Sequence, residues 1–313
     1  MTPIYSEQAL TALIEQTPLV LVYFTGGTCA ACWAIQGELE KILADFPQVA
    51  AAEVSAETQK ALCAAYGVFA VPTALLFTQG KEALRFGRVQ SAFSGSGNRI
   101  PADEELEVIP ETSYCAYCDN ETIHGIEFER VPVLKDAEAV PLVADMTSNF
   151  LTRPVDVNKF GLFYASAQKN LGIAGLAVIV LRRDLLGLAG TEVPTLLNYS
   201  VYSRTDSVPN TPPVFQLYVA NLMAQWIEAH GGVAVMDEYA RARAKIVYDA
   251  IDAMPEMYVS HVERESRSRV NAVFRLKDEA LTALFVKEAA EAGLANLAGH
   301  RAVGGIRASM YNA

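Results

Sequence analysis

The sequence predicts an α/β protein made of two segments that fold separately, and three observations support this. The first segment, 1–88, alternates short apolar runs with a helical pattern. The stretch SAFSGSGNRIPADEE is small, polar and acidic, which is typical of a linker. Beyond it, strand-like runs such as PLVADM and LAVIVL alternate with long helical patterns. We therefore expect a linker over 89–104, a large domain over 105–253 and a small C-terminal domain over 254–313.

Each expected element follows from the spacing of apolar residues. Short apolar or alternating runs predict strands at 20–24, 74–77, 141–146, 176–181 and 270–276. Apolar residues at helical spacing predict helices over 31–46, 213–230, 235–254 and 278–292. The alternation of both kinds of element supports the α/β class in each segment.

Composition excludes several classes of function. The chain has 313 residues, half of them hydrophobic, which is enough for buried cores, and its 36 acidic residues outnumber its 25 basic ones. No basic stripe could follow a phosphate backbone, so we expect no nucleic-acid partner. No apolar run is long enough to span a bilayer, and the N-terminus lacks the pattern of a signal peptide. Four of the five cysteines form two Cys-x-x-Cys pairs, which favours redox or metal chemistry in the cytoplasm.

The first Cys-x-x-Cys motif joins Cys29 and Cys32 and follows the strand predicted at 20–24. The chain turns there through two glycines into a helix, so the sulfur of Cys29 would lie near the positive end of the helix dipole. This position favours the thiolate. Cys32, one helical step further on, could attack a mixed disulfide formed at Cys29 and release it. We therefore predict a nucleophile at Cys29 and a resolving thiol at Cys32.

Val71-Pro72-Thr73 precedes the strand-like run ALLF. Together with the order strand, Cys-x-x-Cys, helix, this makes segment 1–88 resemble thioredoxin. The resemblance implies that Pro72 follows a cis peptide bond and faces the disulfide.

Three features of the segment depart from that family. Thr28 stands where a tryptophan usually precedes the first cysteine, and Tyr23 stands where a buried acid is expected. The chain also diverges after Phe86, before the closing helix of the thioredoxin fold, which predicts one partly uncovered sheet face. A degenerate module used for docking or solubility is the alternative to a redox role.

The second motif joins Cys115 and Cys118. Four thiolates could hold zinc, but the two pairs lie in separate segments, and the alternation of a strand places Cys115 and Cys118 on opposite faces. We therefore predict no metal site and interpret this pair as core or near-site cysteines. Cys63, alone in a helical pattern, is expected to be a small buried side chain.

A second group of candidate residues lies in the larger segment. Asp145 ends the apolar run VADMTSN, and Lys169 ends the run LFYASAQKNLG. The ends of strands are where α/β sheets assemble ligand sites. A pyridoxal enzyme needs a lysine amine and a carboxylate at the pyridine nitrogen, and this pair supplies both.

The sequence of the larger segment resembles phosphoserine aminotransferase over about 95–313. The blocks that carry the resemblance, in family order and at family-like spacing, are NETIHGIEF at 120–128, the run at 144–187, NTPPVF at 210–215, RSRVNAVF at 267–274 and GHRAVGGIRASMYNA at 299–313. The resemblance implies part of a pyridoxal-phosphate-dependent transferase domain of fold type I, the aspartate-aminotransferase-like fold.

The resemblance also implies roles for individual residues. Lys169 would carry pyridoxal 5'-phosphate as a Schiff base, and Asp145 would pair with its ring nitrogen. Thr122 would contact the hydroxyl side of the cofactor, and Gln168 would lie beside it. His124 has no role in this scheme and is interpreted as a hydrogen-bonded histidine at a strand end.

Further residues are expected to reach the substrate or a second subunit. Asn210 and Thr211 would contact the cofactor phosphate of the neighbouring subunit, which implies a homodimer with shared sites. His300, Arg301 and Arg307 match the block that holds the acidic substrate, and guanidinium groups bind carboxylate and phosphate in a bidentate manner.

Part of the family pattern is not found. The family has an N-terminal section with a substrate-binding His-Arg pair, a glycine-rich turn for the cofactor phosphate and a tryptophan that stacks on the ring, and the thioredoxin-like segment stands in its place. The chain ends inside the block at 299–313, which the family follows with one more helical stretch. We therefore expect an uncovered sheet edge and face, and weakened cofactor binding.

Three functions follow from these patterns. The first is a transaminase that moves an amino group between glutamate and 3-phosphohydroxypyruvate, a phosphorylated 2-oxo acid, in serine biosynthesis. The second is a thiol-disulfide oxidoreductase or redox adaptor that uses Cys29 and Cys32. The third is a fused or mispredicted gene product without catalysis.

Overall fold

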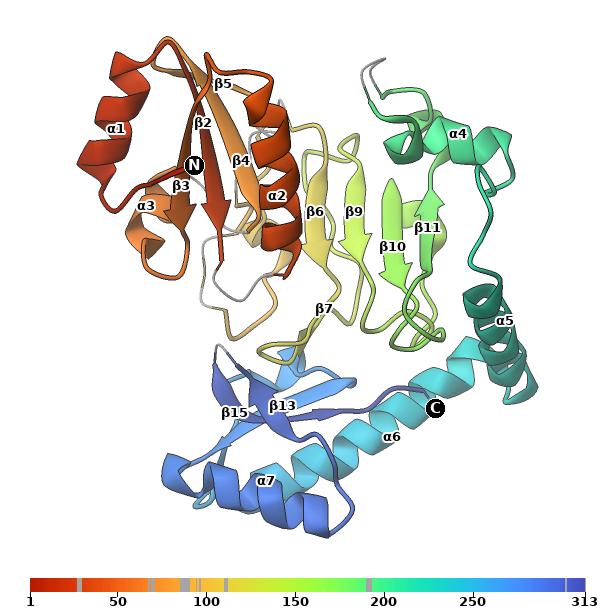
Figure 1. Ribbon diagram of the computed structural model, residues 1–313. Coiled ribbons are helices and arrows are strands. Elements are labelled where there is room, and N and C mark those ends of the chain that lie inside the picture. Colours follow the sequence, from red (N-terminus) through yellow and green to blue (C-terminus); the bar gives the residue numbers. More distant parts are fainter. Residues whose placement is uncertain are drawn as a thin grey trace. The chain divides into compact units, whose positions relative to one another are not determined.

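The computed structural model forms two compact units, Met1–Ser91 and Ala92–Ala313, and each is described by itself. The structure describes residues 1–26, 30–66, 68, 71–84, 91–93, 95, 97–109, 112–189, 193–301 and 303–312. Figure 1 labels the elements of both units.

The first unit contains one five-stranded sheet with three helices. Its elements are β1 (Thr2–Pro3), α1 (Glu7–Gln16), β2 (Leu19–Thr25), α2 (Ala30–Ala44), β3 (Ala50–Ser55), α3 (Lys60–Ala65), β4 (Thr73–Thr78) and β5 (Lys81–Leu84). The strand order is β1-β3-β2-β4-β5, with β2 parallel to β3 and antiparallel to β4. This arrangement is a thioredoxin-like unit.

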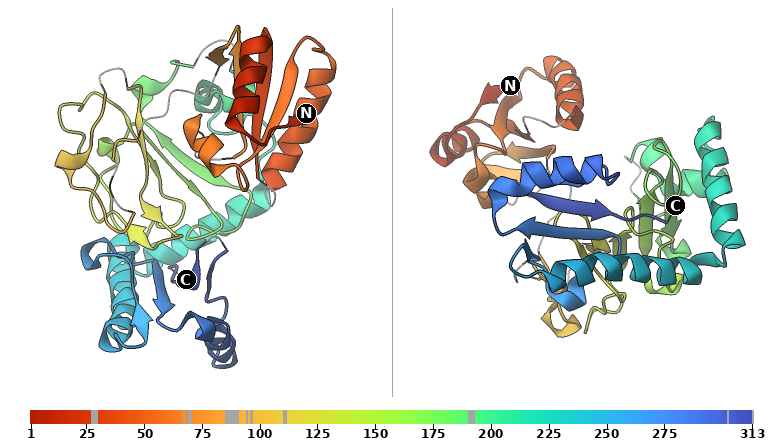
Figure 2. Two further views of the ribbon diagram at one scale, coloured as in Figure 1. Left: turned by 90° about the vertical axis from the view of Figure 1, so that its left-hand side faces the viewer. Right: turned by 90° about the horizontal axis from the view of Figure 1, so that it is seen from below.

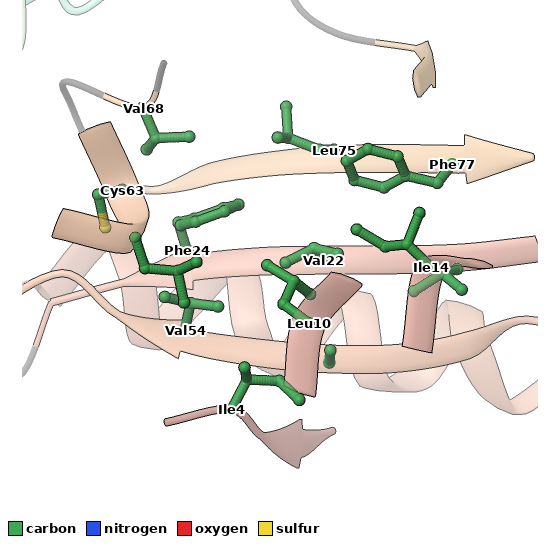
Figure 3. Close-up of a cluster of buried hydrophobic side chains, with 13 residues drawn as sticks. Ile4, Leu10, Ile14, Val22, Phe24, Val54, Cys63, Val68, Leu75 and Phe77 are labelled. Atoms are coloured by element: carbon green, nitrogen blue, oxygen red, sulfur yellow. The ribbon is translucent and has the colours of Figure 1, made fainter. Parts of the chain in front are cut away.

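The two faces of this sheet are covered unequally. Val22 and Phe24 of β2 are fully buried against Leu10 of α1 and its neighbours, as Figure 3 shows. On the opposite face, Leu21 and Leu76 remain half-buried. Tyr23, on the same face as Leu21, is fully buried, so the partly uncovered face expected from the sequence stays a prediction.

The second unit begins with a four-stranded sheet in the order β11-β10-β9-β6. The strands of this unit's first part are β6 (Cys115–Cys118), β7 (Asn120–Glu121), β8 (Ile126–Glu127), β9 (Leu142–Asp145), β10 (Leu162–Ser166) and β11 (Ala177–Leu181). Strands β6, β9 and β10 are parallel, and β11 is antiparallel to β10 (Figure 1).

The faces of the four-stranded sheet also differ in burial. Leu142, Ala144 and Phe163 point into a core with loop residues such as Leu134. Alternation along the strands places Cys118, Tyr164 and Ile179 on the other face, where all three are exposed. The expected open sheet face is therefore present.

Helices and a second sheet complete the unit. The remaining elements are α4 (Tyr199–Arg204), α5 (Val214–Ala229), α6 (Gly232–Ala253), β12 (Tyr258–Val259), β13 (Asn271–Leu276), α7 (Thr282–Glu291), β14 (Ala298–His300) and β15 (Gly304–Ser309). The C-terminal sheet has the order β12-β13-β15-β14, and α6 and α7 run beside it (Figure 2). Ile251 of α6 and Phe285 of α7 pack on Phe274 and Ile306 of this sheet.

All strands and helices predicted from apolar spacing are present, with bounds that differ by a few residues. Asn98 and Ile100, from the polar stretch expected as a linker, belong to the second unit and are held in it, since Glu263 N donates to Asn98 O and Ile100 N donates to Ser266 Oγ, each at 2.9 Å. Among the described helices, none combines the length and apolar character needed to cross a bilayer.

Candidate active site

Asp145 lies at the carboxyl end of β9, where its backbone and its neighbours define its position. Thr147 N donates to Asp145 Oδ1 at 2.8 Å. The strand register places Cys118 of β6 and Tyr164 of β10 on either side of Asp145. The carboxylate is half-buried and belongs to the open face of the sheet.

Lys169 lies in the turn that follows β10. Gly172 N donates to Ala167 O at 2.7 Å, and Ala167 N donates to Leu176 O at 2.9 Å, so the turn is closed by its own backbone. Ala167 also packs on Ala220 of α5. Lys169 is half-buried, and within the described ranges its amine has no hydrogen bond or ion pair. It is therefore available for a ligand.

Hydrogen bonds hold the turns after β9 and β10 together. Ser166 N donates to Thr147 Oγ1 at 3.2 Å, and Asn170 Nδ2 donates to Thr152 Oγ1 at 2.9 Å. These contacts bring the segments that carry Asp145 and Lys169 to one end of the sheet.

Thr122 belongs to a turn between β7 and β8 that is ordered by one carboxylate. Glu121 accepts hydrogen bonds from the backbone N of Ile123 and of His124, each at 2.8 Å, and from His124 Nδ1 at 2.9 Å. Arg307 Nη1 donates to Thr122 O at 3.1 Å, which brings two of the predicted site residues together.

The other predicted substrate residues lie near the end of the C-terminal sheet. His300 closes β14 and pairs with Gly304 of β15, and Arg301 is exposed in the connecting turn. Within one chain, the structure brings Arg307 to the Thr122 turn, whereas no hydrogen bond or ion pair between described residues joins Arg301 to it.

Gln168, Asn210 and Thr211 stand apart from these contacts. Gln168 is exposed beside Lys169. Asn210 and Thr211 are exposed just before α5, and Asn210 Nδ2 donates only to the neighbouring Thr211 O at 3.2 Å among the described residues.

A histidine pair lies next to the Thr122 turn. The rings of His124 and His261 meet edge to face, with centroids 5.9 Å apart. Burial, and secondarily the neighbouring His124, lower the pKa of His261. The interpretation of His124 as a hydrogen-bonded histidine is confirmed by its bond to Glu121.

In the second unit, a buried polar cluster joins β7 to the segment after β9 and to β13, and no pattern in the sequence indicated it directly. Asn120 Nδ2 donates to Ser148 Oγ and to Asn271 Oδ1, each at 2.8 Å, and Asn120 Oδ1 accepts from Ser268 Oγ at 2.6 Å. Asn120 opens the family-like block at 120–128, and Asn271 lies within the block at 267–274. These two blocks were the only indication of the cluster in the sequence.

Two buried ion pairs lie beside this cluster. Arg153 Nη2 contacts both carboxylate oxygens of Asp119 at 2.9 and 2.8 Å, and Arg269 Nε lies 3.2 Å from Glu127 Oε2. Asn149 Nδ2 donates to both carboxylates and connects the pairs. Burial raises the pKa of Glu127, whereas Arg269 opposes that shift.

The cysteine motif of the first unit is only partly described. Cys32 is buried and disulfide-bonded, and Tyr23 OH donates to Cys32 O at 2.8 Å. Cys29 and Thr28 lie outside the described residues. The Val71-Pro72 peptide bond is cis, as expected.

The remaining cysteines agree with their predicted roles. Cys63 is buried, Cys115 packs in the core and Cys118 lies on the opposite, open face, and all three are free. In the described part of the chain, no three His, Cys, Asp or Glu residues are grouped to hold a metal.

The fold and this site define a fold type I transferase domain that follows a thioredoxin-like unit. The aminotransferase class-V family model matches residues 89–313, so the chain belongs to that family. The thioredoxin family model matches residues 2–93.

Relatives and a solved structure give the same result. The chain is 44% identical to phosphoserine aminotransferase of Chromobacterium violaceum over 236 residues, which cover 74% of this chain and 65% of the relative. For the Drosophila melanogaster phosphoserine aminotransferase the identity is 45% over 239 residues, with the same two coverages. The crystal structure of PLP-bound phosphoserine aminotransferase from Trichomonas vaginalis is 30% identical, with a TM-score of 0.64 over 96% of this chain and 81% of that chain. The chain thus spans slightly less than two thirds of the length of these curated relatives.

Proposed function

We propose that this chain is a pyridoxal-phosphate-dependent transaminase that moves an amino group between L-glutamate and 3-phosphohydroxypyruvate, a step in serine biosynthesis. The observation that carries the proposal is the half-buried amine of Lys169, which has no hydrogen bond or ion pair with any residue that the structure describes, at the sheet end where Asp145 lies. The names of the relatives support the choice of substrates.

The residues at this end of the sheet fit the cofactor. Lys169 offers a free amine, and Asp145 offers a carboxylate fixed on one oxygen by a backbone N–H. When bound, pyridoxal 5'-phosphate supplies an electron sink for the α-carbon of the amino acid and accepts its amino group. Lys169 would hold the cofactor and then carry the proton at that α-carbon, while Asp145 would keep the ring nitrogen protonated. Thr122 and Gln168 would position the ring.

Cationic residues on the C-terminal sheet would select acidic substrates. Arg307 is half-buried and fixed to the Thr122 turn, so its guanidinium has little freedom to lose on binding a carboxylate. Arg301 would add positive charge on the neighbouring hairpin, and His300 would add a hydrogen-bonding imidazole. Local charge of this kind matters in a chain whose net charge is −11.

We also propose that the working form is a homodimer. Asn210 and Thr211 are exposed and have no hydrogen bond to the Lys169 turn among the described residues, so they could serve the site of a second copy. The cytoplasmic location remains a prediction from the sequence.

Reductive labelling tests the assignment of Lys169. Purified chain is mixed with pyridoxal phosphate, reduced with borohydride, digested and analysed by mass spectrometry. We expect the pyridoxyl group on Lys169 and its loss in Lys169→Ala. Lys159→Ala is the matched control, because Lys159 is exposed and lies on the same unit. Label spread over exposed lysines, or unchanged in Lys169→Ala, would reject the proposal.

A second candidate function, thiol-disulfide exchange by the first unit, is favoured by the disulfide at Cys32. Cys29 would be the attacking thiolate and Cys32 the resolving thiol. Reduction of insulin by the dithiol form should disappear in Cys29→Ser. Activity that persists in this variant would eliminate the candidate.

A further inference from the structure

Tyr164 is one of the two residues that pair directly with Asp145 across the sheet. The parallel register of β9 and β10 pairs the two residues directly, so their side chains leave the same face. Desolvation, and then the charge of Asp145 and the interaction of the tyrosine hydroxyl with its carboxylate, raise the pKa of Tyr164 to about 12. The tyrosine side chain remains 37% exposed.

The other groups beside Asp145 fix only one oxygen of its carboxylate and leave the second to be held by another residue. Thr147 N fixes Oδ1 of the carboxylate at 2.8 Å. Cys118 is the neighbour on the other strand, but its Sγ donates to Asn120 O at 3.2 Å. A carboxylate held on one oxygen can still change its tilt, and a donor on the adjacent strand restricts that motion.

We propose that Tyr164 is a positioning residue whose hydroxyl holds the Asp145 carboxylate in the orientation that receives the pyridine nitrogen. This inference rests on the proposed function. Tyr164 itself does not touch the reacting atoms in this scheme, and it acts through Asp145.

The rigid surroundings of the pair support this role. Both residues lie on strands, and the turns that follow these strands are joined by the Ser166 to Thr147 hydrogen bond. A site built on strands holds its groups more closely than one built on loops. The backbone that carries Tyr164 is therefore held in place, and this allows the tyrosine hydroxyl to orient the carboxylate.

A double-mutant cycle tests the inference. The dissociation constant of pyridoxal phosphate is measured by fluorescence for the full chain, Tyr164→Phe, Asp145→Asn and the double variant. We expect Tyr164→Phe to weaken binding by about 10-fold, as for loss of a hydrogen bond to a charged group, and to have no further effect in Asp145→Asn. Cys118→Ala is the matched control on the other side of Asp145 and should leave binding unchanged.

A measurement without cofactor separates this inference from the proposed function. In protein with ring-labelled tyrosine, NMR titration should show the pKa of Tyr164 falling toward its ordinary value in Asp145→Asn. If the full chain does not bind pyridoxal phosphate, the proposed function fails, and the positioning role fails with it. If binding occurs but the Tyr164 titration is unchanged in Asp145→Asn, or the Tyr164→Phe effect persists there, only the positioning role is overturned.

Discussion

At the scale of single residues, several buried polar side chains of this protein have hydrogen-bonding or charged partners that are buried as well. Tyr23 replaces a buried acid expected from the thioredoxin resemblance, yet its hydroxyl has a partner at Cys32 O. Burial raises the pKa of Tyr23, with a smaller contribution from Glu53. The position therefore contributes a neutral hydrogen bond instead of a charge.

The buried ion pair of Asp119 and Arg153 offers the strongest test of how much a buried partner contributes to stability. The two side chains are 2% and 7% exposed, so removing one partner leaves an uncompensated buried charge. We expect Arg153→Met to lower the free energy of unfolding by about 3–5 kcal/mol. Urea unfolding followed by the fluorescence of Trp226, in a Trp33→Phe background, would measure it.

An exposed ion pair provides the control. Arg182 and Asp184 are joined by two hydrogen bonds but remain in solvent, so Arg182→Ala should cost no more than about 1 kcal/mol. Equal losses for Arg153→Met and Arg182→Ala would show that burial does not govern the first pair.

At the scale of elements, the turn over 122–125 joins β7 to β8 and lies against β13 of the C-terminal sheet. Gly125 ends this turn with φ +80°, and a Cβ there would lie 2.7 Å from Asn271 O. Ser268 N also donates to Gly125 O at 2.8 Å. The turn that presents Thr122 is thus fixed against the strand β13 by a close backbone approach.

Replacement of Gly125 by alanine should disturb this connection. Gly125→Ala combines the cost of positive φ, about 1 kcal/mol, with a clash against backbone. Gly187→Ala is matched, because Gly187 has φ +86° and open space around its Cβ position. Unfolding free energies should fall clearly more for Gly125→Ala. Similar losses of unfolding free energy in the two variants would mean that the close approach of Gly125 to Asn271 O adds nothing to the cost of the substitution.

The sequence predicted elements better than contacts between them. Long apolar patterns identified α5, α6 and β9, because burial of one face demands that spacing. Strands of two residues such as β7 carry no such pattern. Asp145 and Lys169 were found because they end apolar runs, whereas Tyr164 depends on register between separate strands.

Charged residues of the core escaped prediction for a related reason. In the sequence, Asp119 and Arg153 look like ordinary surface charges, and only the fold brings them together across 34 residues. Their burial is a property of the tertiary contact, not of the local pattern.

At the scale of the whole molecule, apolar side chains around α4 and α5 are exposed in the single chain. The large ones are Leu196, Leu197, Tyr199, Val208, Val214, Phe215, Leu217, Tyr218 and Leu222. They flank the segment that carries Asn210 and Thr211. Large apolar side chains that are exposed along one stretch of a chain typically mark an interaction site. The proposed second copy would cover it and receive Asn210 and Thr211 at its site.

Mixed dimers test whether the sites are shared. Lys169→Ala removes the lysine of its own site, and an Asn210→Ala/Thr211→Ala chain removes groups proposed to serve the partner's site. Each homodimer should be impaired, but random exchange makes half of the dimers mixed, and each mixed dimer keeps one complete site. After the two chains are unfolded and refolded together, activity should therefore recover to about a quarter of the activity of the unaltered chain.

The Phe215 side chain is 65% exposed, and Phe215→Arg should prevent both association and recovery, whereas Ile246→Arg on α6 should not. Recovery without association in the ultracentrifuge, or association without recovery, would contradict shared sites.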